Sequence, residues 1–350
     1  MESTVRVLLP DPSTHVLDHK CSAHLLTVEE RAARWSWQSL RTESVPDAEL
    51  TRLLGQNHAL MTCLMYPNAP LSRLTNICEW FAYWFLLDDV YTEPDRYGFD
   101  LDRAASVAAD LMTVLETGKA PRRFEFGPAL ADIWGRIRAD LRPEMRDRFV
   151  HLLAKMLDGF QVAVAARSTE KSVDLEYYWK HRYYDSAMAW CFLMIEYALD
   201  VDLGRDAPDS VGFDALQTVA LRHSILVNDL LGFRKEYVQG DGWNCVSVLC
   251  RTEDLGIQDA IDRVARMARN AEDDFAARQR RLITAHREDH PAWADYVTEM
   301  GHTLAGLIEW QYRSTRYHGV RHSWNGTRSG VVLLTPEQTL FDPTDRPGAV

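Results

Sequence analysis

Residues 80–93 read Trp80-Phe81-Ala82-Tyr83-Trp84-Phe85-Leu86-Leu87-Asp88-Asp89-Val90-Tyr91-Thr92-Glu93 and are followed by Pro94, which ends a helix. At about 100° per residue, Phe81, Phe85 and Asp88 fall on one helical face, so an aromatic stripe leads to a carboxylate. Acid at a helix C-terminus opposes the helix dipole, and two adjacent carboxylates repel each other. A divalent cation such as Mg²⁺, which prefers oxygen ligands, would remove both objections. The stretch predicts either a metal site or a solvated acidic helix end.

A second polar stretch, residues 228–236, reads Asn228-Asp229-Leu230-Leu231-Gly232-Phe233-Arg234-Lys235-Glu236. Asn228, Gly232 and Glu236 are four residues apart and climb one face of a predicted helix, so they can converge on one ion. Asn228 and Glu236 offer oxygens, whereas Gly232 leaves room for a water molecule. Taken alone, this pattern also fits an ordinary polar helix face.

The rest of the chain favours an all-α fold. The 350 residues are 46% hydrophobic and 26% charged, which suffices for a large core. Apolar residues recur at three- and four-residue spacing, and runs that alternate as in strands are scarce. We expect an N-terminal arm over 1–28, one helical domain over 29–320, and a tail or closing segment over 321–350. Helices are expected at 28–40, 47–65, 71–91, 101–117, 127–137, 143–166, 175–199, 213–237, 243–251, 257–285 and 291–317.

Charge and composition exclude several classes of partner. The net charge of −12 argues against nucleic acid, which binds clustered Lys and Arg. The longest apolar run, 187–195, is too short for a membrane span, and the first nine residues lack the apolar core of a signal peptide. The six cysteines show no CxxC spacing, which indicates a reducing, cytoplasmic location. The acidic run 272–274 is expected to be an exposed helix face.

The two polar stretches together resemble the metal motifs of microbial, single-domain class I terpene synthases. Asp88-Asp89-x-x-x-Glu93 is similar to the aspartate-rich motif of that family. The stretch from Asn228 to Glu236 is similar to its second motif, ND-x-x-S/T-x-x-x-E. This resemblance implies one α-helical isoprenoid synthase bundle with a central active-site cavity.

The resemblance extends to residues outside these motifs. The family carries a diphosphate-sensing arginine about 46 residues before the asparagine, and Arg182 stands there. The family's linker and helix-break effector then fall on Asp185 and Ser186. Its Arg-Tyr pair, about 80 residues after the glutamate, falls on Arg316-Tyr317.

By this resemblance the protein ionises a linear isoprenyl diphosphate with three Mg²⁺ ions and cyclises the carbocation. The metal ligands would come from Asp88, Asp89, Glu93, Asn228, Gly232 and Glu236, with Asp88 holding two ions and the second motif the third. The phosphate oxygens would be bound by Arg182, Lys235, Arg316 and the Tyr317 hydroxyl. Aromatic faces stabilise cations without capturing them, and the expected cavity wall is Phe81, Trp84, Phe85, Tyr178, Trp190 and Trp310.

Gly232 departs from the family motif, which has Ser or Thr there, and we expect water to replace the hydroxyl. Gly232→Ser should then keep or improve activity. The first choice of substrate is farnesyl diphosphate, followed by geranylgeranyl diphosphate. A chain-elongating prenyltransferase would carry a second DDxxD in place of the motif at Asn228, and a non-catalytic helical scaffold is the alternative of a different class. A homodimer is a candidate assembly.

Overall fold

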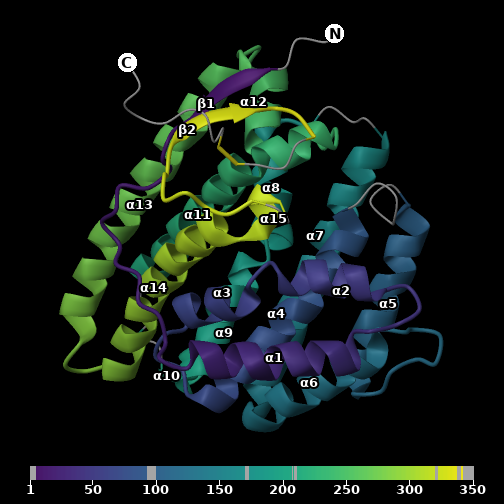
Figure 1. Ribbon diagram of the computed structural model, residues 1–350. Coiled ribbons are helices and arrows are strands. Elements are labelled where there is room, and N and C mark those ends of the chain that lie inside the picture. Colours follow the sequence, from purple (N-terminus) through teal and green to yellow (C-terminus); the bar gives the residue numbers. More distant parts are fainter. Residues whose placement is uncertain are drawn as a thin grey trace.

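The computed structural model describes residues 5–92, 100–169, 173–206, 208, 211–319, 322–336 and 340–341, and this part of the chain is an all-α bundle with two short strands (Figure 1). The predicted ligand Glu93 lies outside the described residues. The helices are α1 (Leu25–Ser39), α2 (Asp47–Leu54), α3 (His58–Met65), α4 (Leu71–Thr92), α5 (Leu101–Thr117), α6 (Gly127–Asp140), α7 (Pro143–Thr169), α8 (Leu175–Asp185), α9 (Met188–Leu199), α10 (Leu203–Asp206), α11 (Val211–Val238), α12 (Cys245–Thr252), α13 (Ile257–His286), α14 (Pro291–Arg313) and α15 (Thr315–His318).

Helix α4 runs through the interior of the bundle. Its central residues are buried on nearly every side, as their apolar and aromatic character requires. It packs against α1, α3, α6 and α9, while α11 packs along α13 and α14 packs along α3. The C-terminal parts of α4, α11 and α14 line one region of the bundle.

Three predicted helices are each two helices in the structure. The predicted helix 47–65 breaks at Asn57, which has φ 63°, and the predicted helix 175–199 breaks at Ala187, which has φ 60°. The predicted helix 291–317 breaks at Ser314, whose hydroxyl caps α15. Left-handed backbone costs a non-glycine residue about 1–2 kcal/mol, and Asn adopts it more readily than most residues, so the break at Ala187 is the one that its residue type does not indicate.

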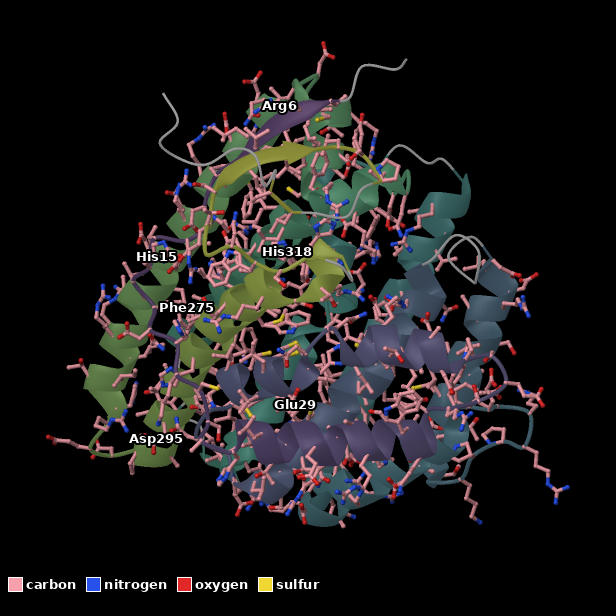
Figure 2. All side chains as sticks on the ribbon, viewed as in Figure 1. Arg6, His15, Glu29, Phe275, Asp295 and His318 are labelled. Atoms are coloured by element: carbon pink, nitrogen blue, oxygen red, sulfur yellow. The ribbon has the colours of Figure 1, made fainter. Side chains whose placement is uncertain are left out.

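The two strands were not predicted. β1 (Arg6–Leu9) and β2 (Gly330–Leu333) pair antiparallel, with Val7 opposite Val332. β1 contacts α13. Figure 2 shows Arg6 on β1 at one end of the molecule and His15 farther from that end, beside α13. The chain between them is tied down by Glu272, whose carboxylate accepts the backbone N–H of Thr14 at 2.7 Å. Glu272 is only 1% exposed, so the prediction of an exposed acidic face is wrong for this residue.

One described helix is long and apolar enough to cross a membrane, judged by length and composition alone. It is the segment Pro143–Arg167 of α7, with a mean hydropathy of 1.3 over its best window. In the bundle α7 packs against α5, α8 and α9, and Phe149, Leu153 and Val164 are buried in the core.

Candidate active site

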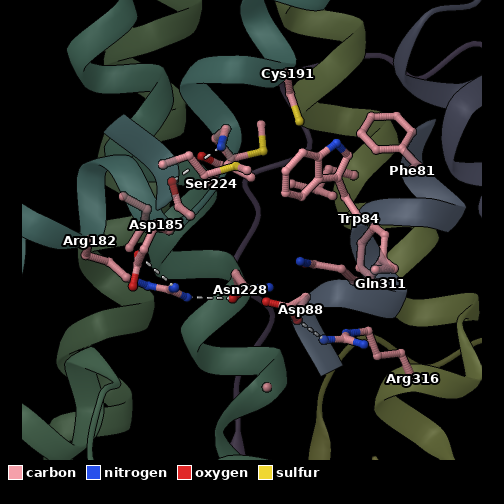
Figure 3. A pocket seen from close by; sticks show the side chains of 18 of the residues that line it. Phe81, Trp84, Asp88, Arg182, Asp185, Cys191, Ser224, Asn228, Gln311 and Arg316 are labelled. Carbon is pink, nitrogen blue, oxygen red and sulfur yellow. Dashed lines mark hydrogen bonds and ion pairs between the residues drawn. The ribbon is translucent and has the colours of Figure 1, made fainter. Parts of the chain in front are cut away.

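A cavity of about 200 Å³ opens between α3, α4, α7, α8, α9, α11 and α14. Its wall is apolar and sulfur-rich at one end and carries acids and cations at the other (Figure 3). The residues that sequence predicted for the site and that line this cavity are Phe81, Trp84, Phe85, Asp88, Arg182, Asp185, Ser186, Trp190, Asn228, Gly232, Lys235, Glu236, Trp310, Arg316 and Tyr317. Asp89 and Tyr178 are not part of the wall.

The aromatic wall is fixed by ring packing. Phe85 is wedged between His58, whose ring stacks on it with centroids 4.7 Å apart, and Trp310, which meets it edge-on at 5.4 Å. Trp190 stacks on Trp80 at 4.7 Å. Burial and the nearby Arg316 lower the pKa of His58 to about 3, so this ring is neutral at physiological pH. The wall therefore presents rigid, uncharged π faces to the cavity.

The carboxylates at the end of α4 have different surroundings. Asp88 faces the cavity and pairs with Arg316. Asp89 is fully buried and accepts bonds of 2.7 Å from both Arg52 Nη2 and Arg316 Nη1. Burial alone would raise the pKa of Asp89, but Arg316, Lys235 and Arg52 outweigh it and lower that pKa well below its usual range. Asp89 thus holds Arg316. It does not line the cavity, where it was predicted to be a metal ligand.

Arg182 joins the helix break to the second motif. Its guanidinium donates to Asn228 Oδ1 at 2.9 Å and to Asp185 Oδ1 at 3.1 Å (Figure 3). It also donates to Asp229 Oδ1 at 3.1 Å. Burial raises the pKa of Asp185 to about 6, although Arg182 opposes the shift. The other Asp185 oxygen accepts Trp243 Nε1 at 2.5 Å. The break between α8 and α9 is therefore locked to α11 through one arginine.

Tyr178 lies behind the second motif and not on the cavity wall, so its predicted place is wrong. Its hydroxyl donates to the buried carboxylate of Asp229. That carboxylate also accepts the backbone N–H of Cys245 at 2.8 Å. The Asp229 carboxylate is therefore engaged in structural hydrogen bonds that fix α11 against α8 and α12.

Glu236 is the acid of the second motif that reaches the cavity. Asn244 Nδ2 donates to Glu236 Oε2 at 2.6 Å. Burial and repulsion from Asp229 and Asp241 raise the pKa of Glu236 to about 7. Burial and Arg316 lower the pKa of the neighbouring Lys235 ammonium. A cation near Glu236 would relieve the repulsion between these acids.

The oxygen groups fit a hard divalent cation. Asp88 from α4 faces Asn228 and Glu236 from α11 across the polar end of the cavity, and all are oxygen donors of the kind Mg²⁺ takes. No cluster of three His, Cys, Asp or Glu exists among the described residues, so the two motifs supply separate acids. Gly232 lies beside Glu236, where an added Cβ would come within 2.9 Å of Glu236 Oε1.

Several residues in and behind the cavity wall were missed from the sequence. Trp243 lines the cavity, and the buried Asn244 beside it caps α12 by accepting Val246 N at 2.8 Å. An asparagine before an apolar helix is a cap signal, so Asn244 could have been found as a cap but not as a partner of Glu236. Gln311 donates to the Tyr317 hydroxyl at 3.2 Å, and Asn228 Nδ2 donates to the same oxygen at 3.1 Å.

A family model described as terpene synthase family 2, C-terminal metal binding, matches residues 79–274, which include both metal motifs. The chain belongs to the terpene synthase family. Terpene synthases are lyases that act on isoprenyl diphosphates, and this terpene synthase shows the family's metal-binding region. The resemblance read from the motifs is thereby confirmed.

Proteins similar to this terpene synthase over nearly its whole length include microbial terpene synthase-like protein 13 of Selaginella moellendorffii. It is 26% identical, and the match covers 95% of each chain. The (+)-germacrene D synthase of the same plant is 27% identical over 87% of this chain and 89% of its own. The crystal structure of germacradien-4-ol synthase from Streptomyces citricolor superposes with a TM-score of 0.76 at 20% identity, covering 86% and 98% of the chains. The all-α terpene synthase fold is therefore confirmed.

Proposed function

We propose that this terpene synthase is a Mg²⁺-dependent cyclase of farnesyl diphosphate. The observation that carries the proposal is one cavity with an aromatic wall at one end and oxygen donors beside cations at the other. The oxygen donors are Asp88, Asn228 and Glu236, and the cations next to them include Arg182, Lys235 and Arg316. A prenyl chain fits the first environment and a diphosphate with its metal ions fits the second. The names of similar proteins, among them (+)-germacrene D synthase and (3S,6E)-nerolidol synthase, favour a C15 substrate.

The reaction would begin with heterolysis of the C–O bond, whose electron pair leaves with the diphosphate. Arg182, Lys235 and Arg316 border the same end of the cavity and would stabilise the charge that develops on the leaving group. The Tyr317 hydroxyl would add a hydrogen bond. Mg²⁺, when bound by Asp88, Asn228 and Glu236, would supply the remaining positive charge. Three ions are the expectation from the family resemblance.

The carbocation left behind needs walls that stabilise it and cannot react with it. Phe81, Trp84, Phe85 and Trp310 offer aromatic faces, each stabilising a desolvated cation by about 0.5–2 kcal/mol. Phe85 already lies against a cation, because the Arg316 guanidinium carbon is 5.0 Å from its ring centroid. This contact places Phe85 at the boundary between the diphosphate end and the hydrocarbon end.

The cations and acids of the site neutralise one another. Arg316 pairs with Asp88, and Arg182 pairs with Asp185 and Asp229 and donates to Asn228. Binding of metal and diphosphate would exchange these partners: the oxygens turn to the metal and the guanidinium groups to phosphate. The exchange keeps every charge compensated, which lets an acidic protein bind a polyanion.

The test is gas chromatography with mass detection on purified protein given geranyl, farnesyl and geranylgeranyl diphosphates, with Mg²⁺ and with chelator. A cyclic C15 product that disappears with chelator is expected. A cyclic C20 product would shift the proposal to a diterpene cyclase. No product from any of the three substrates would favour the non-catalytic scaffold and overturn the proposal.

Two variants and one control assign the site residues in the same assay. Asp88→Ala and Asn228→Ala should abolish turnover, because each removes a cavity oxygen. Asp273→Ala should leave it unchanged, because Asp273 lies on α13 and bonds Thr14 of the arm.

The six cysteines are free thiols, which fits the predicted cytoplasmic location. A homodimer stays a prediction.

A further inference from the structure

Gly232 is the one position where the second motif departs from its family pattern, and its surroundings in the fold are specific. A Cβ built on Gly232 would lie 2.9 Å from Glu236 Oε1 and 3.4 Å from Glu236 Cδ. The space that a side chain at 232 would take is therefore already filled by the Glu236 carboxylate. Because the two residues are one helical turn apart on α11, this contact is local and needs no movement of the backbone.

Asn244 holds the carboxylate in that place. Its Nδ2 donates to Glu236 Oε2 at 2.6 Å and to the carbonyl oxygen of Asp229 at 2.8 Å. Its Oδ1 accepts the N–H of Val246 at the first turn of α12. Asn244 is fully buried, and the backbone donor fixes which end of its amide carries the oxygen, so the NH₂ group can only face Glu236 and Asp229.

This arrangement leaves Glu236 Oε1 without a bond to Asn244. Asn244 engages Oε2, whereas Oε1 is the atom that lies above Gly232 at the cavity wall. In the family pattern, that region belongs to the hydroxyl of a Ser or Thr. In this chain, a carboxylate oxygen stands there.

We infer that Glu236 supplies from Oε1 the oxygen that a hydroxyl at position 232 would supply, with Gly232 and Asn244 as the residues that position it. The inference rests on the proposed function, since it concerns how the same metal site is completed. It replaces the expectation that water fills the gap. The absent side chain at 232 is then a requirement of the site and not a defect.

The two explanations predict opposite effects of Gly232→Ser. If water fills the gap, an added hydroxyl replaces the water and metal binding stays equal or tightens. If Glu236 fills it, the new Cβ displaces the carboxylate and metal binding weakens. Gly232→Ala adds the Cβ without adding an oxygen and should weaken binding under either explanation, so Gly232→Ser is the deciding variant. Ala also favours a helix over Gly, so Gly232→Ala should fold.

The experiment is calorimetric titration of Mg²⁺ into protein saturated with inorganic diphosphate, which needs no turnover. We expect Gly232→Ala and Gly232→Ser to weaken Mg²⁺ binding by about tenfold each. We expect a similar loss for Asn244→Asp, which keeps the acceptor for Val246 but removes the donor to Glu236. Circular dichroism and melting temperature on the same samples check that each variant is folded.

The outcomes separate the inference from the proposed function. Equal or tighter Mg²⁺ binding in folded Gly232→Ser would overturn the role of Glu236. Wild-type affinity in folded Asn244→Asp would overturn the role of Asn244. A wild-type protein that binds no Mg²⁺ with diphosphate would instead overturn the proposed function, and the inference with it.

Discussion

Arg316 Nη1 donates to Asp89 Oδ1 at 2.7 Å, across 227 positions of the chain. This contact ties the end of α4 to α15 at the polar end of the cavity. Asp89 has no place in the cavity wall, whereas its neighbour Asp88 does. The adjacent carboxylates are thus divided between two tasks: one faces the cavity and the other positions a guanidinium.

Asp89→Ala should destabilise the protein by about 3 kcal/mol, because it leaves Arg52 and Arg316 facing a buried gap. Asp88→Ala should cost less than about 1 kcal/mol, since the Asp88 side chain is 31% exposed. Urea unfolding of both variants measures the difference. Equal losses in the two variants would contradict the division of tasks.

Gly159→Ala should impair turnover by disturbing the break between α8 and α9. A Cβ at Gly159 of α7 would lie 2.8 Å from the backbone N of Asp185 and 3.2 Å from its Cα, and backbone cannot give way cheaply. We expect at least a tenfold loss of kcat and a changed product ratio. Gly135→Ala on α6 is the matched control: its Cβ meets nothing within 4 Å, so it should stabilise the protein by about 0.5–1 kcal/mol without affecting products.

Trp243→Phe should lower kcat by roughly tenfold, about 1.4 kcal/mol of barrier. The variant keeps a ring against Tyr178 but removes the Nε1 donor to Asp185. Asp185 would then accept hydrogen bonds from Arg182 but not from the side chain at 243. Arg182 would lose its fixed orientation as a result. Steady-state kinetics should show the effect in kcat more than in KM; a change confined to KM would argue against a positioning role.

Acidification should destabilise the protein in part through His223. Burial lowers the pKa of His223 to about 4, and neither ring nitrogen has a hydrogen-bond partner within the described residues. Between pH 7 and 5 the unfolded chain, with a histidine pKa near 6.5, binds a proton that the folded chain does not bind. The free energy of unfolding therefore falls as the pH falls. The loss is about 2 kcal/mol for this one residue.

His223→Leu should remove this loss. Urea unfolding at pH 7 and pH 5 should show a smaller pH difference for the variant than for the wild type. The exposed His24→Gln serves as the control and should keep the wild-type difference. An unchanged pH difference in His223→Leu would assign the acid sensitivity to other groups.

Much of the site could be predicted because its chemistry is carried by short motifs on regular helices. Helical spacing alone placed Asp88 at the end of an aromatic stripe and Asn228 and Glu236 on one face. Arg182 and Arg316 came from the family resemblance, and both line the cavity. Helix positions were predictable for the same reason, since apolar periodicity repeats along each of them.

Other features depend on contacts between distant segments, which no local pattern encodes. Tyr178 was expected at the cavity but bonds Asp229, because the rotation of α8 is set by packing against α7 and α12. Glu272 was expected to be exposed but is covered by the N-terminal arm. The strand pair escaped prediction because each strand has four residues and its partner lies more than 320 positions away.

The pairing of β1 with β2 also constrains how the protein is made. Arg6–Leu9 leave the ribosome more than 320 residues before Gly330–Leu333. A ladder between them cannot form until Gly330–Leu333 have been synthesised, and contacts of such sequence separation are slow to close. The helices between the two strands can assemble earlier, so the pairing of β1 with β2 beside α13 is a late folding event.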